Sequence, residues 1–261
     1  MHTKKHNGPT ENGIERVEFP IRLGRYLAMC GVASRRRCAE LVKDGKALVD
    51  GVAVVDPWRF VDEGQTVLVD GKKITPPDFV YVMLNKPVGY ACTNVDPKQR
   101  RRAIELINIP GHRLFSAGRL DKDSEGLIIF TDDGNYTHRL THPRNEIWKT
   151  YHVTISRPLS SKEIRKALDG ITDDGEFLKP IIIRHLSGNS YVFILGEGKK
   201  REIRRIVVAL GARVHELRRV GVGALPLGGL NLGSWRHLTP DEIQASLSPK
   251  VFVGRGFLHT N

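Results

Sequence analysis

The proline pair in Pro76-Pro77-Asp78 divides the chain into two segments with different hydrophobic patterns. Proline fixes φ and removes a backbone donor, so two in succession end regular structure and are typical of a linker. The 261 residues suffice for two modest domains. We therefore expect a small domain over residues 21–75 and a larger one over residues 80–245. Residues 1–20 are predicted to be a disordered start and residues 246–261 a loose tail.

The small segment contains two helical patterns followed by β-like runs. Apolar spacing predicts a helix that begins at Leu23 and ends before Gly31, which acts as a C-cap. Ser34 is predicted to cap a second helix over residues 35–43. Asp-Gly and Glu-Gly turns separate the three β-like runs at residues 47–49, 52–55 and 66–69.

In the larger segment, strand-like and helical patterns alternate irregularly. A strict βαβ rhythm is absent, which favours an α+β fold with a mixed or antiparallel sheet over a doubly wound one. In the helical run 202–210, apolar residues share one face, and Arg204 and Arg205 begin the opposite face. The other expected elements are strands at residues 80–84, 127–131, 151–155 and 191–195 and a helix at residues 162–168.

Composition narrows the class of protein. Lys and Arg total 41 against 29 Asp and Glu, so the net charge is +12 and a polyanion is the leading candidate partner. Three cysteines without a C-x-x-C pair predict a reducing, cytoplasmic compartment. No apolar run approaches the length of a membrane span, and the first residues lack the pattern of a secretory signal. These features argue against a membrane protein.

The positive charge is clustered along the chain. One cluster alone is consistent with a solvated face, but four favour phosphate binding, because concentrated cations repel one another. In the first cluster the arginines occupy the first turn of a helix, where they oppose the helix dipole, so phosphate contact explains them better than stability does. The clusters are Arg35-Arg36-Arg37, Lys98 with Arg100-Arg101-Arg102, Lys199-Lys200-Arg201 with Arg204-Arg205, and Arg218-Arg219.

The small segment resembles a known RNA-binding domain. Leu23-Gly-Arg-Tyr-Leu-Ala, Gly31-Val-Ala-Ser-Arg-Arg and Val49-Asp-Gly are similar to stretches of the S-four-type domain. The resemblance implies binding to structured RNA rather than DNA. Recognition by shape and phosphate contacts fits a basic helix with few aromatic residues. Arg35, Arg36 and Arg37 are the expected RNA contacts here.

The densest polar stretch is Gly118-Arg-Leu-Asp-Lys-Asp-Ser-Glu-Gly126, directly before an apolar run. A carboxylate in such a loop beside a buried strand is well placed as a nucleophile or base. A turn whose Asp and Ser cap local backbone groups is the plain structural alternative. A calcium loop is disfavoured, because no helix precedes it and its twelfth position is Asp132 instead of Glu.

From Phe79 to Ile243, successive motifs resemble those of ribosomal RNA pseudouridine synthases of the small-subunit-type class. The motifs are Leu84-Asn-Lys-Pro-Val-Gly89, the stretch 118–127, Lys149-Thr-Tyr-His-Val153 and Glu197-Gly-Lys-Lys-Arg-Glu-Ile-Arg-Arg205. Ala91-Cys-Thr-Asn-Val-Asp-Pro97 makes members that modify the large subunit (23S rRNA) the closer likeness. The resemblance implies isomerisation of a uridine in rRNA without a small-molecule cofactor, and we expect a monomer that does not bind a membrane.

The resemblance also implies roles for individual residues. Asp121 is the expected catalytic carboxylate, attacking either the uracil ring or the anomeric carbon of the sugar. Tyr151 is expected to stack on the extruded uracil, and Arg204 to form an ion pair with Asp121. Arg119 is the expected occupant of the space that the base leaves. Lys86 and Arg201 are expected to position RNA, as are Lys199, Lys200 and Arg205.

Other functions stay open at this point. A catalytically idle RNA-binding assembly factor would have no need of a carboxylate in an RNA cleft, and a small-subunit (16S rRNA) target is a further alternative. A DNA-binding regulator lacks a recognition-helix motif. His138 and His142 are spaced i, i+4, but without a third ligand we assign no metal site. P-loop, dinucleotide and H-E-x-x-H motifs are absent, so no cofactor is expected.

Overall fold

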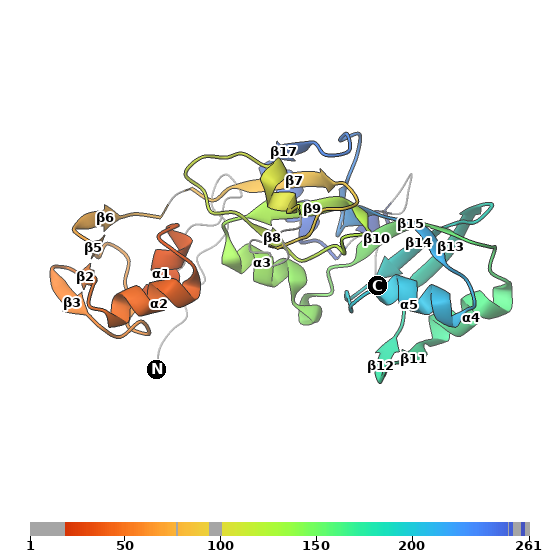
Figure 1. The fold of residues 1–261 in the computed structure, drawn as a ribbon, viewed down its shortest axis with the longest axis horizontal. Coiled ribbons are helices and arrows are strands. Elements are labelled where there is room, and N and C mark those ends of the chain that lie inside the picture. The colour runs from red at the N-terminus through yellow and green to blue at the C-terminus, as the bar shows by residue number, and fades with distance from the viewer. Residues whose placement is uncertain (1–18, 77, 94–100, 250, 253–256, 259–261) are drawn as a thin grey trace. The chain divides into compact units, whose positions relative to one another are not determined.

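A computed structural model describes residues 19–76, 78–93, 101–249, 251–252 and 257–258. Most of the expected disordered start, the predicted basic residues Lys98 and Arg100, and part of the Ala91–Pro97 motif lie outside the described residues. The chain divides into two compact units, shown in Figure 1. The first comprises residues up to 80 with the segments 109–113 and 132–134, and the second comprises the remainder.

The first unit is a pair of helices packed with two small sheets. Helices α1 (Leu23–Met29) and α2 (Arg35–Lys43) form at their predicted positions, and Ser34 Oγ caps α2 by accepting a bond from the Arg37 amide. Fully buried apolar residues from both helices and from the strands make one core. The strands are β1 (Ile21–Arg22) paired with β4 (Phe60–Val61), and the sheet β3 (Val52–Val54), β2 (Ala47–Val49), β5 (Val67–Val69) and β6 (Lys72–Ile74).

The second unit is built on a nine-stranded mixed sheet, which confirms the predicted α+β fold. Its main order is β13-β14-β10-β15-β9-β7-β17, with β8 paired to β9 and β16 paired to β15. The bounds are β7 (Tyr81–Lys86), β8 (Phe115–Ala117), β9 (Glu125–Thr131), β10 (Lys149–Ile155), β13 (Ile182–Ser187), β14 (Ser190–Leu195), β15 (Val214–Val222), β16 (Leu225–Pro226) and β17 (Trp235–His237).

A short parallel pairing between β9 and β15 joins the two halves of this sheet, whereas its other strand pairs are antiparallel. Only two aligned pairs define it, Glu125 with Arg218 and Gly126 with Arg219. The backbones approach closely here: a Cβ added to Gly126 would lie 2.2 Å from the carbonyl oxygen of Arg219. Gly126 also has φ +105°, which L side chains rarely adopt. Glycine is therefore required at this junction.

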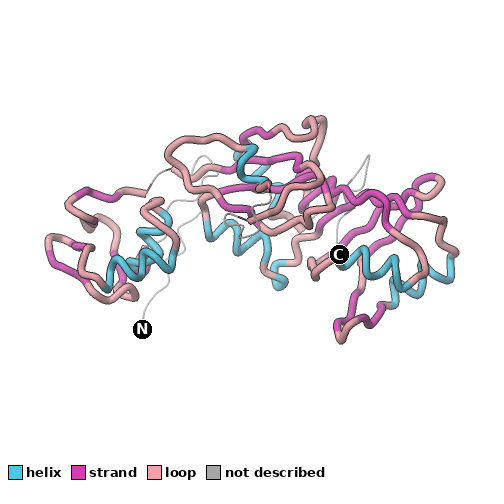
Figure 2. Tube along the Cα trace, in the orientation of Figure 1, coloured by secondary structure: helices cyan, strands magenta, loops and turns pink. Residues whose placement is uncertain are grey.

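Helices flank the sheet, with strands and helices distinguished by colour in Figure 2. They are α3 (Gly134–Thr141), α4 (Ser161–Asp169), α5 (Glu202–Ala209) and α6 (Pro240–Ser246), with short 3-10 turns at Ala103–Leu106 and Pro143–Asn145. The hairpin of β11 (Ile171–Asp173) and β12 (Glu176–Leu178) follows α4. Within the described part of the chain, no helix is long and apolar enough to cross a membrane.

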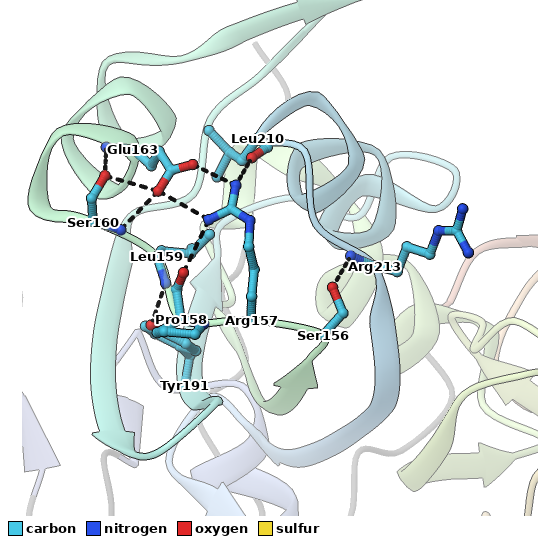
Figure 3. A network of polar contacts seen from close by, with 9 residues as sticks. All are labelled: Ser156, Arg157, Pro158, Leu159, Ser160, Glu163, Tyr191, Leu210 and Arg213. Carbon is cyan, nitrogen blue, oxygen red and sulfur yellow. Dashed lines mark hydrogen bonds and ion pairs between the residues drawn. The ribbon is translucent and has the colours of Figure 1, made fainter.

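One arginine links the end of β10 to two helices, as Figure 3 shows. Arg157 Nη2 lies 2.6 Å from a carboxylate oxygen of Glu163 in α4, and it also donates to the carbonyl of Leu210 at the end of α5. Glu163 in turn completes a capping box with Ser160 at the start of α4. The network fixes where α5 ends relative to the sheet.

Two regions differ from the pattern expected for them. The segment 214–222 is predicted only as a basic cluster, yet it forms the long strand β15, because His215, Glu216, Arg218 and Arg219 hide its alternation. In the segment predicted to be a loose tail, β18 (Val251–Phe252) pairs with β19 (Phe257–Leu258) in an antiparallel arrangement. At least these residues have regular backbone structure.

Candidate active site

A cavity of about 240 Å³ opens beside the β9–β15 junction of the second unit. Strands β8, β9, β10 and β15 contribute to its wall, together with α3 and two connecting loops. Among the described residues, the lining has cationic and aromatic side chains and no carboxylate. Its residues are Ala117, Gly118, Arg119, Ile129, Leu140, Thr141, Lys149, Tyr151, Gly198, Arg219 and Val222.

The loop 118–124 connects β8 to β9 and carries Asp121 two residues after Arg119, which lines the cavity. The Asp121 main-chain carbonyl accepts a bond from the Ser124 amide, which makes the loop a tight turn. Gly118 begins the loop with φ +84°, so it supplies the bend. Asp121 is half-buried, and among the described residues its carboxylate has no hydrogen-bond or ion-pair partner. It is therefore available to a ligand.

The rest of the loop is held at several points. The Leu120 amide donates to Cys92 Sγ at 3.4 Å, and the Gly89 amide donates to the Lys122 carbonyl at 2.8 Å. Arg219 Nη1 lies 3.4 Å from the Arg119 carbonyl. Such contacts keep the loop rigid, which a reacting group requires.

Arg204 contacts Asp123 instead of Asp121, in contrast to the expected ion pair. Its Nε lies 3.3 Å from Asp123 Oδ2, and its Nη2 donates to the Asp123 carbonyl at 2.7 Å. Arg201 adds a two-pronged pair to the same carboxylate, at 2.9 and 3.1 Å. Burial would raise the pKa of Asp123, but these two arginines hold it below its ordinary value. Both cations thus hold the Asp121 loop through Asp123, and the negative charge of Asp121 itself also acts to raise the pKa of each arginine.

Tyr151 and Lys149 project from the same strand into the cavity lining. They are two residues apart on β10, so strand geometry places both side chains on one face. Tyr151 is aligned with Arg219 across β10 and β15, and both are more than nine-tenths buried. Arg219 Nε donates to the Leu127 carbonyl at 2.6 Å. A flat ring and fixed positive charge therefore share one small space.

The remaining predicted RNA contacts fall into two groups. Lys86 is fully buried and donates to the carbonyls of Pro87 and Tyr90, so it supports the turn before Cys92 instead of facing RNA. Lys199 pairs with Glu197, and Arg205 pairs with Asp173 and Glu176. The exposed residues are Arg35, Arg36, Arg37, Arg119 and Lys200, of which Arg37 pairs with Glu40.

Sequence reasoning gives no separate role to Asp123 or Lys149, and it places Arg219 in a basic cluster expected to bind phosphate, whereas Arg219 is buried and donates to a main-chain carbonyl. Lys149 lies two residues before Tyr151, just outside the strand predicted at residues 151–155, so extending that strand by two residues would have placed both side chains on one face. The partners of Asp123 and Arg219 are separated from them by about 80 to 100 residues. Local pattern does not reveal such contacts. In the described part of the chain, no three His, Cys, Asp or Glu side chains gather as metal ligands would.

The chemistry available here is that of an unpaired carboxylate beside a cationic, aromatic cavity. A carboxylate is a nucleophile or base, and fixed cations stabilise negative charge that develops on a bound group. A planar ring in the wall offers a surface on which a heterocycle can stack. The site therefore suits attack on an electron-poor heterocycle or its attached carbon.

Comparison with known proteins identifies the family. A sequence model of the family described as RNA pseudouridylate synthase matches residues 80–209. An uncharacterized RNA pseudouridine synthase of Aquifex aeolicus is 38% identical over 230 residues, which cover 86% of this chain and 95% of the relative. A putative ribosomal large subunit pseudouridine synthase of Arabidopsis thaliana, chloroplastic, is 32% identical over 250 residues, which cover 87% of this chain and 61% of the relative. A crystal structure of a pseudouridylate synthase superposes with a TM-score of 0.64 at 28% identity, covering 87% of this chain and 99% of the other. The chain is a member of the RNA pseudouridine synthase family.

Proposed function

We propose that this enzyme converts a specific uridine of ribosomal RNA to pseudouridine, with the large subunit as its target. One observation carries the proposal: the Asp121 carboxylate is unpartnered among the described residues, on a loop held rigid beside a cationic and aromatic cavity. The reaction breaks the bond between C1′ and N1 of uridine and joins C1′ to C5. It involves neither oxidation nor transfer to a second molecule.

Three side chains have distinct roles in this proposal. Asp121 attacks the nucleoside, either at the uracil ring or at the anomeric carbon, and both routes need its ionised form. Tyr151 stacks on the uracil inside the cavity. The uridine must first leave the RNA stack, at a cost of a few kcal/mol, and exposed Arg119 fills the space it vacates.

The charge distribution supports RNA as the substrate. The chain carries +12, and Arg35 and Arg36 are exposed at the start of α2 without a partner among the described residues. The small unit resembles the S-four-type RNA-binding domain. The Arabidopsis relative is named for the large ribosomal subunit, which favours 23S over 16S rRNA. An idle RNA-binding factor is disfavoured, because an unpaired carboxylate in an RNA cleft repels phosphate.

The test is to map pseudouridine in rRNA of both subunits from cells that lack the gene. We expect one large-subunit position to lose the modification, wild-type protein to restore it, and Asp121→Asn to fail. Asp121→Asn keeps the size of the side chain, so its affinity for the rRNA should stay close to that of wild type. Intact modification in the deletion cells would refute the proposal. Loss in the small subunit instead would refute the large-subunit target.

A further inference from the structure

Lys149 is a cavity-lining cation whose donors are left unused. Its side chain lines the cavity from β10, and among the described residues its ammonium has no hydrogen-bond or ion-pair partner. Arg219 differs, because its Nε and Nη1 are committed to the carbonyls of Leu127 and Arg119. Arg219 therefore supplies fixed charge, while the three donors of Lys149 remain for a ligand.

The position of Lys149 matches one side of a base stacked on Tyr151. The two side chains line the cavity from one face of β10. The edge of a base stacked on Tyr151 would therefore face the Lys149 ammonium. An ammonium group donates and does not accept, so it fits the carbonyl edge of uracil. Cytosine presents an amino group at the same edge. Because this group and the ammonium are both hydrogen-bond donors, binding of cytosine is disfavoured.

We propose that Lys149 binds a carbonyl oxygen of the target uracil and stabilises the negative charge that the base acquires during the reaction. This inference rests on the proposed function. When the C1′–N1 bond breaks, its electron pair stays on N1 and spreads to the carbonyl oxygens of the ring. The bond from C1′ to C5 then forms and the bond to Asp121 breaks, C5 loses its proton and N1 gains one. Lys149 remains an ammonium throughout and exchanges no proton.

The electrostatics of the cavity agree with this role. Burial, reinforced by the charge of Arg219, lowers the pKa of Lys149 to about 8. The other titratable or charged residues in the lining are Arg119 and Tyr151, while the residues aligned with Lys149 on β14 and β15, Leu195 and Val222, are apolar. The attraction between a desolvated ammonium and a carbonyl oxygen of the base increases when that oxygen acquires negative charge.

The first test compares Lys149→Met with wild type in single-turnover assays at saturating rRNA from the deletion cells. We expect the rate at pH 7 to fall about 10²-fold, the size of effect seen when one donor to a developing anion is removed. The melting temperature should stay equal or rise, because methionine replaces a desolvated, unpaired charge with an apolar group of similar shape. Lys162→Met, on the exposed face of α4, is the matched control and should leave the rate unchanged.

The second test uses pH. The second-order rate constant of the wild type reports the free enzyme and should fall as pH rises through about 8, because Lys149 then loses its charge. Lys149→Arg keeps the charge, so it should retain more activity than Lys149→Met and lose this alkaline limb. A limb that persists unchanged in Lys149→Arg belongs to another group and would overturn the inference.

The remaining outcomes are also decisive. If Lys149→Met weakens RNA affinity but leaves the saturated rate intact, Lys149 contacts phosphate and the proposed base contact is wrong. A lower melting temperature with a rate reduced equally in Lys149→Arg would make Lys149 structural and also refute it. If wild-type protein forms no pseudouridine in this rRNA, the proposed function fails. If wild type is active and Lys149→Met equals it at saturation, only this inference fails.

Discussion

Tyr151 lies across from Arg219 in the paired strands β10 and β15. On its other side, Arg219 is aligned with Gly126 of β9. Buried Arg219 therefore lies on β15, between β10, which carries Tyr151, and β9, which follows the Asp121 loop. Its bond to the Arg119 carbonyl continues this connection into the loop itself. The site depends on this arrangement, which leads to the first prediction.

Gly126→Ala should destabilise the protein and reduce its activity. A Cβ at this position meets the Arg219 backbone, and φ +105° adds strain, so we expect a loss of about 3 kcal/mol in the free energy of unfolding. Gly175→Ala is the control, because φ is +74° there but nothing lies within 4 Å of the added atom. It should cost about 1 kcal/mol. Urea denaturation measures both, and equal costs would contradict the steric argument.

Arg204 and Asp123 should act as one unit in catalysis. Arg204→Ala and Asp123→Asn should each lower the saturated single-turnover rate about 10-fold, a change of about 1.4 kcal/mol, because each loosens the Asp121 loop. The double variant should be little slower than the slower single one. Arg165→Ala, on the exposed face of α4, should have no effect. Additive effects would mean that Arg204 acts elsewhere, on Asp121 or on RNA phosphate.

Glu163 should contribute to stability in a pH-dependent way. Hydrogen bonds from Arg157, followed by those from Ser160, lower the pKa of Glu163 to about 2. The stabilisation is therefore full above its ordinary pKa of 4.5 and disappears as pH falls toward 2. In urea denaturation, the difference between wild type and Glu163→Gln should shrink over that range. A constant difference for Glu163→Gln would refute the linkage.

Arg35 and Arg36 should bind phosphate groups of the rRNA. Replacing both by alanine should reduce the slope of log affinity against log salt by roughly 0.7 to 0.9 for each phosphate that the variant no longer neutralises. Lys72→Ala with Lys73→Ala removes the same charge from another exposed part of the small unit and is the control. A reduced slope in the arginine variant alone locates the phosphate-binding residues on α2. Equal reductions would indicate only a general effect of charge.

Local signals predicted much of the fold. Apolar spacing located α1, the Ser34 cap located α2, and β-branched runs located most of β10 and β14. β15 escaped prediction because its environment is set by β9 and β10 on either side, which lets it carry buried Arg219 in a strand. A buried cation needs carbonyl partners that are remote in sequence, so its own neighbourhood gives no sign of burial.

For the site, motif resemblance pointed to Asp121, Tyr151 and Arg204, whose catalytic roles stay predictions, while the structure pairs Arg204 with Asp123. Asp121 and Asp123 are two residues apart, and which carboxylate meets the arginine depends on the turn closed by Ser124. Likewise, Lys86 resembles an RNA contact in sequence but is fully buried. Exposure and turn geometry are properties of the folded chain, and residue type alone does not determine them.

The narrow β9–β15 junction also determines which parts of the sheet can accept substitutions. Asp121 precedes β9 in one half of the sheet and Tyr151 belongs to the other, and two aligned residue pairs join these halves. Substitutions in the outer strands β13 and β17 therefore leave the alignment of the junction untouched. Each half can diverge to suit a different RNA surface while the geometry of the reaction is retained. Substitutions at Gly126 and Arg219 are therefore expected to disturb that geometry more than substitutions in the outer strands do.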